Sequence, residues 1–404
     1  MKPFRNPFRP SAGHPPPHLA GRQKQISEFV GLLDQDPIMT NLILTGLRGV
    51  GKTVLLEKLK PIALEHHWGW VGSDLSESAS ISEENMAIRI LTDLAVWTSM
   101  ITVPEKGKGA GFTTQNRRAK VPLSYMALFE RFSETPGLIA DKLKHVLEYV
   151  WSVLPKDGEG IIFAYDEAQN LADQAAKDQY PLSMLLDIFQ SIERKEVRFL
   201  LVLAGLPTLQ PKLVEARTYT ERMFHVVTLG QLSREESKEA IMKPIQREGC
   251  PVSFDTKSVE TIIDVTAGYP YFIQFICKEV YDIWIRAATA GRPTPKIPIV
   301  ELTKKLDSDF FAGRWAKATD RQRDMLKVIA TLPNCDEEFT VQEIVAASHT
   351  AIEKPFSPSH VNQLLSALTN AGLVFRNRFG KYSFAVPLMG QFIRRQAEQK
   401  DITA

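Results

Sequence analysis

A phosphate-binding loop is the clearest chemical signal in the sequence. Residues 46 to 53 have the sequence GLRGVGKT, which matches the pattern GxxxxGK[ST] in full. Its glycines allow positive φ and close backbone approach, so consecutive N–H groups can surround a phosphate at a helix N-terminus. We expect the Lys52 ammonium to reach the β- and γ-phosphates and to act in catalysis, and the Thr53 hydroxyl to coordinate Mg²⁺.

The segments on either side of the loop are those that such a site needs. Leu42 to Thr45 is a short apolar run typical of a strand, and Thr53 to Leu59 begins a helix with Leu55 and Leu56 inward. A glycine-rich turn with a solvated lysine is the alternative, which this context disfavours. We expect nucleotide contacts along the whole loop and first helical turn: Gly46, Leu47, Arg48, Gly49, Val50, Gly51, Lys52, Thr53 and Val54.

A second strand ends in two carboxylates. IIFAYDEAQN, residues 161–170, is an apolar run followed by Asp166 and Glu167. A buried parallel strand delivers such side chains to the carboxyl edge of its sheet, where ligands bind. We expect Asp166 to hold the metal through water and Glu167 to polarise the water that attacks the γ-phosphate. An ordinary strand end is the alternative, and the phosphate loop favours the catalytic interpretation.

A third strand, Val197 to Ala204, ends without an obvious polar group. A side chain at this place often senses the γ-phosphate in nucleotide switches of this shape. Gly205 and Leu206 take the position, and Thr208 is the nearest hydroxyl. A simple strand-to-helix turn is therefore the favoured interpretation.

Composition sets the broad class of protein. The chain has 404 residues, 44% of them hydrophobic and 24% charged, with a net charge of +2, so two or three globular domains are expected. The charge makes no general case for nucleic acid or an anionic membrane. Three dispersed cysteines argue against a zinc site and a disulfide framework, and no apolar run is long enough to span a bilayer. We expect a cytoplasmic protein with no membrane contact.

Three further segments carry a family resemblance. They are HLAGRQKQISEF (18–29), YTERMFHVVTLGQLSREE (219–236) and TAGYPYFIQFICKEVY (266–281). With the loop and the two carboxylates, they resemble AAA+ P-loop ATPases of the origin-recognition-like and STAND-like branch, often called archaeal-type ATPases. The likeness runs from about Leu19 to about Ile285. It implies ATP or ADP as the ligand, since the loop itself does not distinguish adenine from guanine.

The resemblance also implies roles for residues outside the loop. Leu19, Gly21 and Arg22 would lie near the base, and Gly268 and Pro270 near the nucleotide at the start of a lid helix. Many AAA+ proteins carry an arginine at the start of that helix, but Tyr271 and Phe272 are found here. The missing positive charge predicts slow hydrolysis and a switch rather than a fast motor.

Arg222 has two open interpretations. By the resemblance, it stands where an arginine can reach a nucleotide held by a neighbouring subunit, which would give it a catalytic role in an oligomer. A single arginine before a strand is otherwise a surface ion-pair residue. The sequence leaves both open.

The fold class predicted is α/β, with a P-loop parallel-sheet AAA+ core, a helical lid and a C-terminal winged-helix domain. We expect a proline-rich extended arm at 1–18, the core at 19–230, the lid at 231–290, a linker with a bridging helix at 291–318 and the winged helix at 319–404. Within the core, Ser80 and Glu83 form a capping box that opens a helix to about Ile101, and a second helix spans about 136–154. In the lid, Ser233 and Glu236 form a second capping box, which opens another helix.

A basic loop interrupts the core at residues 104–120. Its five cations are Lys106, Lys108, Arg117, Arg118 and Lys120, against one acid, with Phe112 among them. Such a loop suits a nucleic-acid backbone with an aromatic stacked on a base, or it is simply a solvated surface loop.

The winged helix is predicted from three helices and a hairpin. The helices are expected at 320–331, at 340–348 with Thr340 and Glu343 as a capping box, and from Ser357 or Ser359 to Asn370; the hairpin spans 373–387 with its turn at Gly380. The candidate recognition helix has no Arg or Lys for guanine. The wing's Arg376, Arg378 and Lys381 suit phosphates, although residues 319–404 carry ten basic and nine acidic side chains, a net of +1. Modest DNA binding is favoured over protein docking.

The function expected is Mg²⁺-dependent ATP binding and hydrolysis that drives a change of conformation or assembly on DNA, as a homo-oligomer or with a partner protein. Two alternatives stay open. One is a non-catalytic regulator gated by bound nucleotide, and the other is a scaffold whose winged helix docks a protein, as in defence or transposition assemblies of related ATPases.

Overall fold

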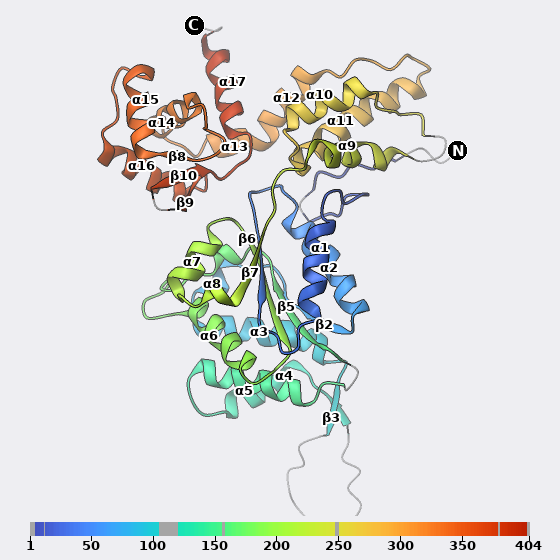
Figure 1. The fold of residues 1–404 in the computed structure, drawn as a ribbon, viewed down its shortest axis with the longest axis vertical. Helices are drawn as coiled ribbons and strands as arrows, with labels where there is room; N and C mark the ends of the chain where they lie inside the picture. Colours follow the sequence, from blue (N-terminus) through green and yellow to red (C-terminus); the bar gives the residue numbers. More distant parts are fainter. Residues whose placement is uncertain are drawn as a thin grey trace, which may run out of the picture. The chain divides into compact units, whose positions relative to one another are not determined.

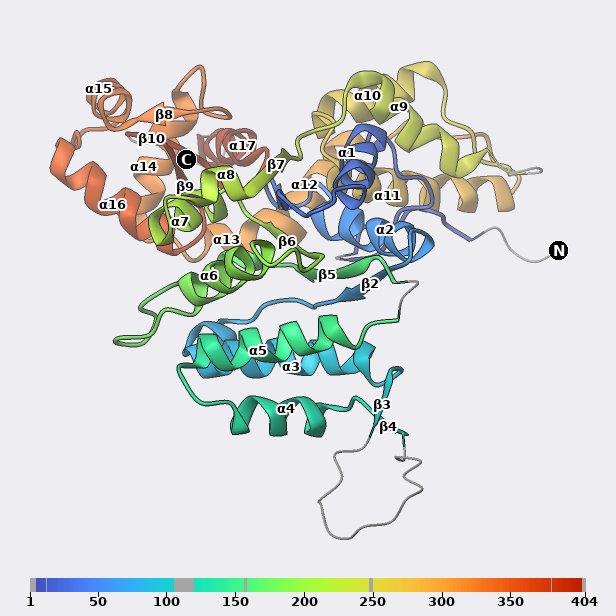
Figure 2. The same cartoon turned by 60° about the horizontal axis from the view of Figure 1, so that its bottom comes forward.

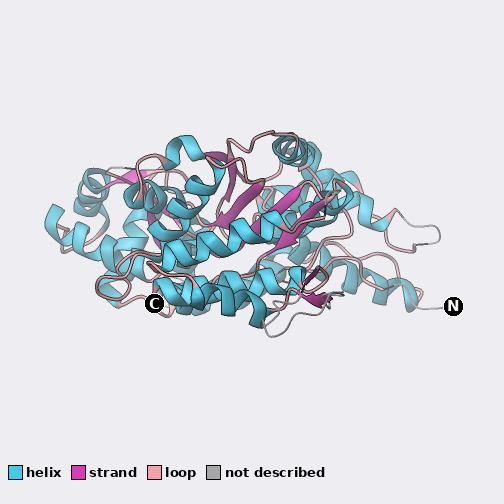
Figure 3. Cartoon of the chain, turned by 90° about the horizontal axis from the view of Figure 1, so that it is seen from below, coloured by secondary structure: helices cyan, strands magenta, loops and turns pink. Residues whose placement is uncertain are grey.

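The computed structural model describes residues 5–11, 13–104, 120–155, 158–246, 250–378 and 380–401. Its contacts divide the chain into two compact units. Unit 1 contains Met1–Arg22, Gly46–Val54 and Leu229–Ala404, and unit 2 contains Gln23–Thr45 and Leu55–Thr228. Figure 1 shows the fold coloured along the sequence, and Figure 3 shows that helices make up most of it.

Unit 2 is built on a parallel sheet. Its strand order is β2-β5-β6-β1-β7, and every neighbouring pair runs parallel. The strands are β1 (Asn41–Thr45), β2 (Trp68–Val71), β5 (Gly160–Tyr165), β6 (Phe199–Gly205) and β7 (Phe224–Thr228). This confirms the predicted parallel-sheet core, with β5 separated from β1 by one intervening strand.

Helices cover both faces of the sheet because its strands are apolar on both sides. Residues 161, 163 and 165 of β5 and 199, 201 and 203 of β6 belong to one hydrophobic core with α3 (Glu83–Thr98), α5 (Ile139–Ser152) and α6 (Pro181–Glu193). The alternate residues of these strands are equally buried and point to the opposite face, since side chains alternate along a strand. Figure 2 shows α1 (Gln23–Leu33) and α2 (Lys52–Glu65) on that other side of the sheet.

The start of α3 corrects one prediction. Its N-cap is Ser82, whose hydroxyl accepts from the Asn85 N–H, and not Ser80. Ser80 lies in a 3₁₀ turn, Glu77–Ser80, and its hydroxyl donates to the Asn170 carbonyl at 2.6 Å. The local sequence could not show this bond, because Asn170 lies 90 positions further along the chain.

The rest of the insertion is a helical layer and a ribbon. The helix expected near 136–154 is α5, and a further helix, α4 (Tyr125–Glu134), was not predicted. The strands β3 (Thr102–Pro104) and β4 (Lys120–Pro122) pair antiparallel, and Lys120 is exposed on β4. The other four cations of the predicted basic loop, and Phe112, lie outside the described residues.

In unit 1, the lid helices are α9 (Arg234–Met242), α10 (Thr256–Thr266) and α11 (Pro270–Thr289). The capping box of Ser233 and Glu236 at α9 is confirmed. The N-terminal arm packs on this lid: Phe8 is buried against Phe254 and Tyr281, and the Asn6 amide donates to the Lys278 carbonyl.

A continuous hydrophobic core joins the lid to the C-terminal part of unit 1. The bridging helix predicted within residues 291–318 consists of α12 (Ile299–Leu306), a π-helical turn (Asp307–Phe311) and α13 (Ala312–Trp315). Phe311 lies with its ring centroid 5.9 Å from that of Phe272 and 5.0 Å from that of Phe392. The π turn therefore packs against both neighbours.

The C-terminal elements follow the predicted winged-helix order. They are α14 (Asp320–Thr331), β8 (Phe339–Thr340), α15 (Val341–Ala351), α16 (Pro358–Asn370), β9 (Val374–Arg378), β10 (Lys381–Phe384) and α17 (Met389–Asp401). The capping box at Thr340 is confirmed, and Ser357 caps α16. The sheet order is β8-β10-β9, and α17, which was not predicted, packs on α14.

The domain boundaries expected from the sequence stay a prediction. Among the described residues, no helix is both long and apolar enough to cross a bilayer.

Candidate nucleotide-binding site

The phosphate loop has the backbone that its glycines permit. Gly46, Gly49 and Gly51 have φ of 156°, 80° and 93°. The Lys52 ammonium donates to the carbonyls of Gly46 at 2.9 Å and Leu47 at 3.0 Å, so its charge is held against the loop. A Cβ at Gly51 would meet no atom within 4 Å, which leaves open space beside the loop. Glycine backbone, a helix N-terminus and an ammonium group together fit a phosphate.

The start of the lid helix holds the loop from outside. The Tyr271 N–H donates to the Gly49 carbonyl at 3.1 Å. A Cβ at Gly49 would lie 2.9 Å from the Tyr271 Cβ, so the contact depends on glycine there. Pro270 is the first residue of α11, and the Gly268 carbonyl accepts from the Leu232 N–H at 2.9 Å. Gly268 and Pro270 thus fix the turn that brings Tyr271 to the loop.

Arg22 holds the loop from the other side. Its guanidinium is buried and donates to the carbonyls of Val50 and Gly230, each at 3.0 Å. Burial lowers the pKa of Arg22, and the Glu236 carboxylate acts in the opposite direction. These bonds give Arg22 a structural role, and its predicted contact with a base stays a prediction, as does that of the half-buried Leu19.

The neighbours of Arg22 leave no room for a larger residue at position 21. A Cβ at Gly21, which has φ of 64°, would lie within 2.7 Å of the Glu236 carboxylate. Further back in the arm, a Cβ at Gly13 would lie 3.8 Å from the Thr53 methyl group. The arm therefore contacts the lid at residues 6–8 and passes beside the phosphate loop at Gly13.

In unit 2, the two carboxylates follow β5 as predicted. Asp166 is buried; its N–H donates to the Ser73 carbonyl at 3.2 Å, and its carbonyl accepts from the Leu75 N–H at 2.9 Å. The Asp166 carboxylate accepts from the Glu167 N–H at 2.7 Å. Glu167 has left-handed backbone, with φ of 52°, so the chain turns sharply after the strand. A hydroxyl at Thr53 and a carboxylate at Asp166 are oxygen ligands of the kind that Mg²⁺ prefers.

Gln169 is a residue that the sequence reasoning missed. Its side-chain amide donates to the Glu167 carboxylate, and its side-chain oxygen accepts from the Leu206 N–H at 3.0 Å. A Cβ at Gly205 would lie 2.8 Å from that oxygen, so a larger residue at the end of β6 would displace the Gln169 side chain. Gln169 therefore links the Glu167 carboxylate to the next strand. Its only sequence signal is its place two residues after Glu167.

The end of β6 has no hydroxyl in the sensing position. Thr208 precedes α7 (Leu209–Ala216) and its side chain makes no capping bond. The polar group beside Gly205 is the Gln169 amide. The simple turn favoured from the sequence agrees with this geometry.

Comparison with known proteins identifies the fold of the chain. A family model described as a domain of unknown function (DUF8462) matches residues 308–393. No curated protein matches the chain. Among solved structures, the ADP form of the Aeropyrum pernix ORC2 protein has a TM-score of 0.54 at 16% identity, covering 96% of this chain and 97% of its own. The Cdc6p structure from Pyrobaculum aerophilum has a TM-score of 0.47 at 15% identity, covering 97% of both chains.

The chain has the fold of an origin-recognition-like AAA+ ATPase. Identities this low show the fold alone. The α/β fold class predicted from the sequence is confirmed.

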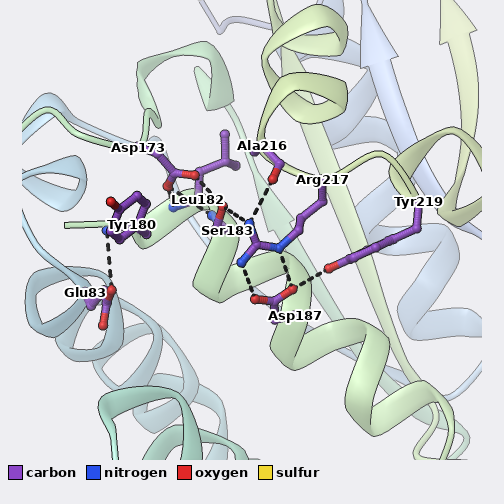
Figure 4. Close-up of polar contacts among 9 residues, drawn as sticks. All are labelled: Glu83, Asp173, Tyr180, Leu182, Ser183, Asp187, Ala216, Arg217 and Tyr219. Carbon is purple, nitrogen blue, oxygen red and sulfur yellow. Dashed lines mark hydrogen bonds and ion pairs between the residues drawn. The ribbon is translucent and has the colours of Figure 1, made fainter. Parts of the chain in front are cut away.

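Within this AAA+ fold, the segment that carries Arg222 is tied to α6. The Arg217 guanidinium donates to both Asp187 carboxylate oxygens, at 2.8 and 2.6 Å, and to the Ser183 hydroxyl at 2.8 Å (Figure 4). The Tyr219 hydroxyl donates to the same Asp187 carboxylate at 2.7 Å. Arg222 follows on α8 (Thr220–Met223) and is exposed. In the described part of the chain, no carboxylate lies within ion-pair distance of the Arg222 guanidinium.

Among the described residues, the interpretation of Arg222 as a surface ion-pair residue therefore has no intramolecular partner to support it. An exposed guanidinium on a braced helix remains able to meet a second subunit. Its predicted action in trans is untested.

The candidate DNA-binding residues lie on separate elements of the C-terminal part. Arg376 on β9 is exposed and Lys381 on β10 is half-buried; Arg378 is on β9, and its side chain lies outside the described residues. On α16, Asn362 and Gln363 are exposed. The His360 ring instead packs edge-on to Phe356, with ring centroids 5.5 Å apart.

Proposed function

We propose that this chain is a Mg²⁺-dependent ATPase that works as a switch, in which the bound nucleotide controls conformation or assembly. The observation that carries the proposal is the phosphate loop, whose backbone is bonded to the first turn of the lid helix through Tyr271 and Gly49. A ligand that fills the loop therefore acts directly on the lid. The similar A. pernix ORC2 protein was solved in an ADP form, which supports an adenine nucleotide.

Each step of hydrolysis has a residue in this proposal. Lys52 and the loop amides would hold the phosphates. Thr53 would coordinate Mg²⁺ and Asp166 would hold the metal through water, and the metal would neutralise charge on the phosphate oxygens. Glu167 accepts a proton from the attacking water, and Gln169 orients its carboxylate. The hydrogen bond from the Gln169 amide holds the Glu167 carboxylate in one orientation, which favours its action as a general base.

The first test is the Glu167→Gln variant. It should bind ATP with the parent affinity while turnover falls at least about 100-fold, because the general base is lost while the loop that holds the phosphates is unchanged. Titration calorimetry and phosphate release measure the two properties. Glu130→Gln, an exposed acid on α4, is the matched control. Hydrolysis by Glu167→Gln at the rate of the parent chain would contradict the assignment of Glu167 as general base. If the parent chain itself turned over less than about once per hour, a non-catalytic regulator would be favoured.

Assembly is the second part of the proposal, and Arg222 is its probe. Light scattering on Glu167→Gln with ATP, with ADP and with neither, each with and without a DNA duplex, should show growth only with ATP. Adding Arg222→Ala should abolish that growth because the trans-acting cation is gone. A monomer in all six conditions would leave an intramolecular switch.

DNA is the partner we propose for the C-terminal domain and the basic loop. Support comes from the exposed Arg376 on the wing and the exposed Lys120 on β4. Affinity should fall steeply with salt, with a slope that Arg376→Ala makes shallower by about one. Absence of salt-dependent DNA affinity in every nucleotide state would favour a scaffold that docks a protein.

A further inference from the structure

The main chain of Asp166 is held by the segment that follows β2. The Asp166 N–H donates to the Ser73 carbonyl at 3.2 Å, and the Asp166 carbonyl accepts from the Leu75 N–H at 2.9 Å. Asp74, which lies between those two residues, forms a parallel β-bridge with Asp166. All of these residues belong to unit 2. The position of residues 73–75 therefore determines the position of the Asp166 backbone, from which its carboxylate extends.

The side chain of Ser73 is held in turn by an ion pair on α3. The Arg89 Nε donates to one Asp93 carboxylate oxygen at 2.9 Å, and the Arg89 Nη2 lies 2.9 Å from the other. The Ser73 hydroxyl donates to the Asp93 carboxylate at 3.1 Å and accepts from the Arg89 guanidinium. The hydroxyl thus uses both its donor and an acceptor on this pair, which fixes the Ser73 side chain.

The burial of the pair indicates what it contributes. The Asp93 side chain is 8% exposed and that of Arg89 is 37% exposed. Burial raises the pKa of the Asp93 carboxyl, while Arg89 and Ser73 act in the opposite direction. Because desolvation offsets much of the attraction within a buried ion pair, such a pair adds little stability over apolar side chains of the same size. It does supply direction, since a planar guanidinium on a carboxylate has a fixed geometry.

We propose that the Arg89–Asp93 pair positions Asp166 for metal binding. The pair fixes the Ser73 side chain, and the Ser73 carbonyl holds the Asp166 N–H, so both α3 residues act without touching metal or phosphate. The inference rests on the proposed function, in which Asp166 would hold Mg²⁺ through water, and deepens it by naming the residues behind that carboxylate. Groups that orient a metal ligand from behind raise the affinity for the metal.

Ser73→Ala tests the proposal with the smallest change. It removes the hydroxyl that joins the α3 pair to residues 73–75 and leaves the ion pair itself in place. Titration calorimetry on the full chain measures the affinity for a non-hydrolysable ATP analogue with Mg²⁺ and again in EDTA. We expect about tenfold weaker binding with Mg²⁺ and a change within about twofold in EDTA, because only the metal loses support. Ser78→Ala, at an exposed serine of the same segment, is the matched control.

Substitutions on α3 test the same link from its other end. Arg89→Met should lower the affinity with Mg²⁺ as Ser73→Ala does, and Arg89→Lys, which keeps the charge without the planar fork, should restore part of it. The double variant of Ser73→Ala and Arg89→Met should lose no more than either single variant, because both break one link. Arg89→Met leaves the buried Asp93 carboxylate without its cation, so Ser73→Ala decides the matter if that chain does not fold.

The outcomes separate the inference from the proposed function. An equal loss of affinity with Mg²⁺ and in EDTA would mean a general structural role for Ser73 and would overturn the inference. Binding by Ser73→Ala that matches Ser78→Ala, or additive losses in the double variant, would overturn it as well. A parent chain that does not bind the analogue, or binds it equally well with Mg²⁺ and in EDTA, would overturn the proposed function itself, and the inference with it.

Discussion

The phosphate loop and the carboxylate segment that follows β5 are both recognised by short motifs, yet they are held in different ways. The loop is held from outside by the Tyr271 N–H, which donates to the Gly49 carbonyl, and by the Arg22 guanidinium, which donates to the Val50 carbonyl. The carboxylate segment is held by two backbone bonds of Asp166 to the segment that follows β2. It is also held by the Gln169 side chain, which lies within the segment and bonds both the Glu167 carboxylate and the Leu206 N–H at the end of β6. The loop belongs with the lid and the C-terminal elements in unit 1, and the carboxylates belong with the sheet in unit 2.

The difference has a functional consequence. In the proposed ATPase, the residues that bind phosphate are part of the unit that contains the lid, so binding and conformation are coupled. The residues that activate water lie on the sheet and do not depend on those bonds. Mutations in one region should therefore change affinity, and mutations in the other should change turnover.

The largest effect is expected for Lys52→Ala. Loss of the ammonium removes the charge that holds the phosphates, so ATP affinity should fall more than about 100-fold, or about 2.7 kcal/mol. Titration calorimetry measures it. Lys58→Ala, an exposed lysine on the same helix, should bind as the parent does. Equal binding by both variants would show that the loop is not the site.

Gln169→Leu tests the carboxylate segment in the same way. It releases the Glu167 carboxylate, so turnover should fall about 10-fold or more while ATP affinity stays within about twofold. The Leu206 N–H loses its acceptor as well, and stability should fall by about 1–3 kcal/mol. Phosphate release and urea denaturation check both values, with the exposed Gln174→Leu as the control. Weaker ATP binding with normal turnover would break the division between the regions.

Gly49→Ala tests the loop's dependence on the lid. A left-handed residue with a Cβ costs about 1–2 kcal/mol, and its contact with Tyr271 is too close. ATP affinity and the melting temperature should both fall. Gly31→Ala on α1 has open space around its Cβ and should raise the melting temperature, since alanine favours helix. A Gly49→Ala chain with parent affinity would show that the contact with Tyr271 does not shape the loop.

The smallest effect concerns the hydrogen bonds to Asp187 that hold the segment carrying Arg222. Burial raises the pKa of the Asp187 carboxyl, but hydrogen bonds from Arg217 and Tyr219 outweigh it and hold that pKa below its ordinary value. The bonds therefore stabilise the fold above the ordinary aspartate pKa of about 3.9, and this contribution is lost as the pH falls through the lower folded value. Asp187→Asn should cost about 1 kcal/mol at pH 7 and much less near pH 2, measured by urea denaturation. An equal loss of unfolding free energy in Asp187→Asn at both pH values would contradict a contribution that depends on the Asp187 charge.

Local signals were sufficient wherever a motif includes its own partners. The capping boxes at Ser233 and Thr340 were predicted correctly because both members lie three residues apart. The box at Ser80 was wrong because the bond that holds Ser80 comes from Asn170, far along the chain. The helices α4 and α17 were missed, and their buried faces are defined only by the elements on which they pack.

The sequence by itself determined the phosphate loop, the two carboxylates, the parallel α/β class and the order of the C-terminal helices. Each of these depends on residue type and spacing within a few turns of chain, where backbone conformation is set locally. The tertiary structure decided that Gln169 bonds the Glu167 carboxylate and that Tyr271 and Arg22 hold the loop. These contacts join residues brought together only by burial of the two hydrophobic cores, which no local pattern records.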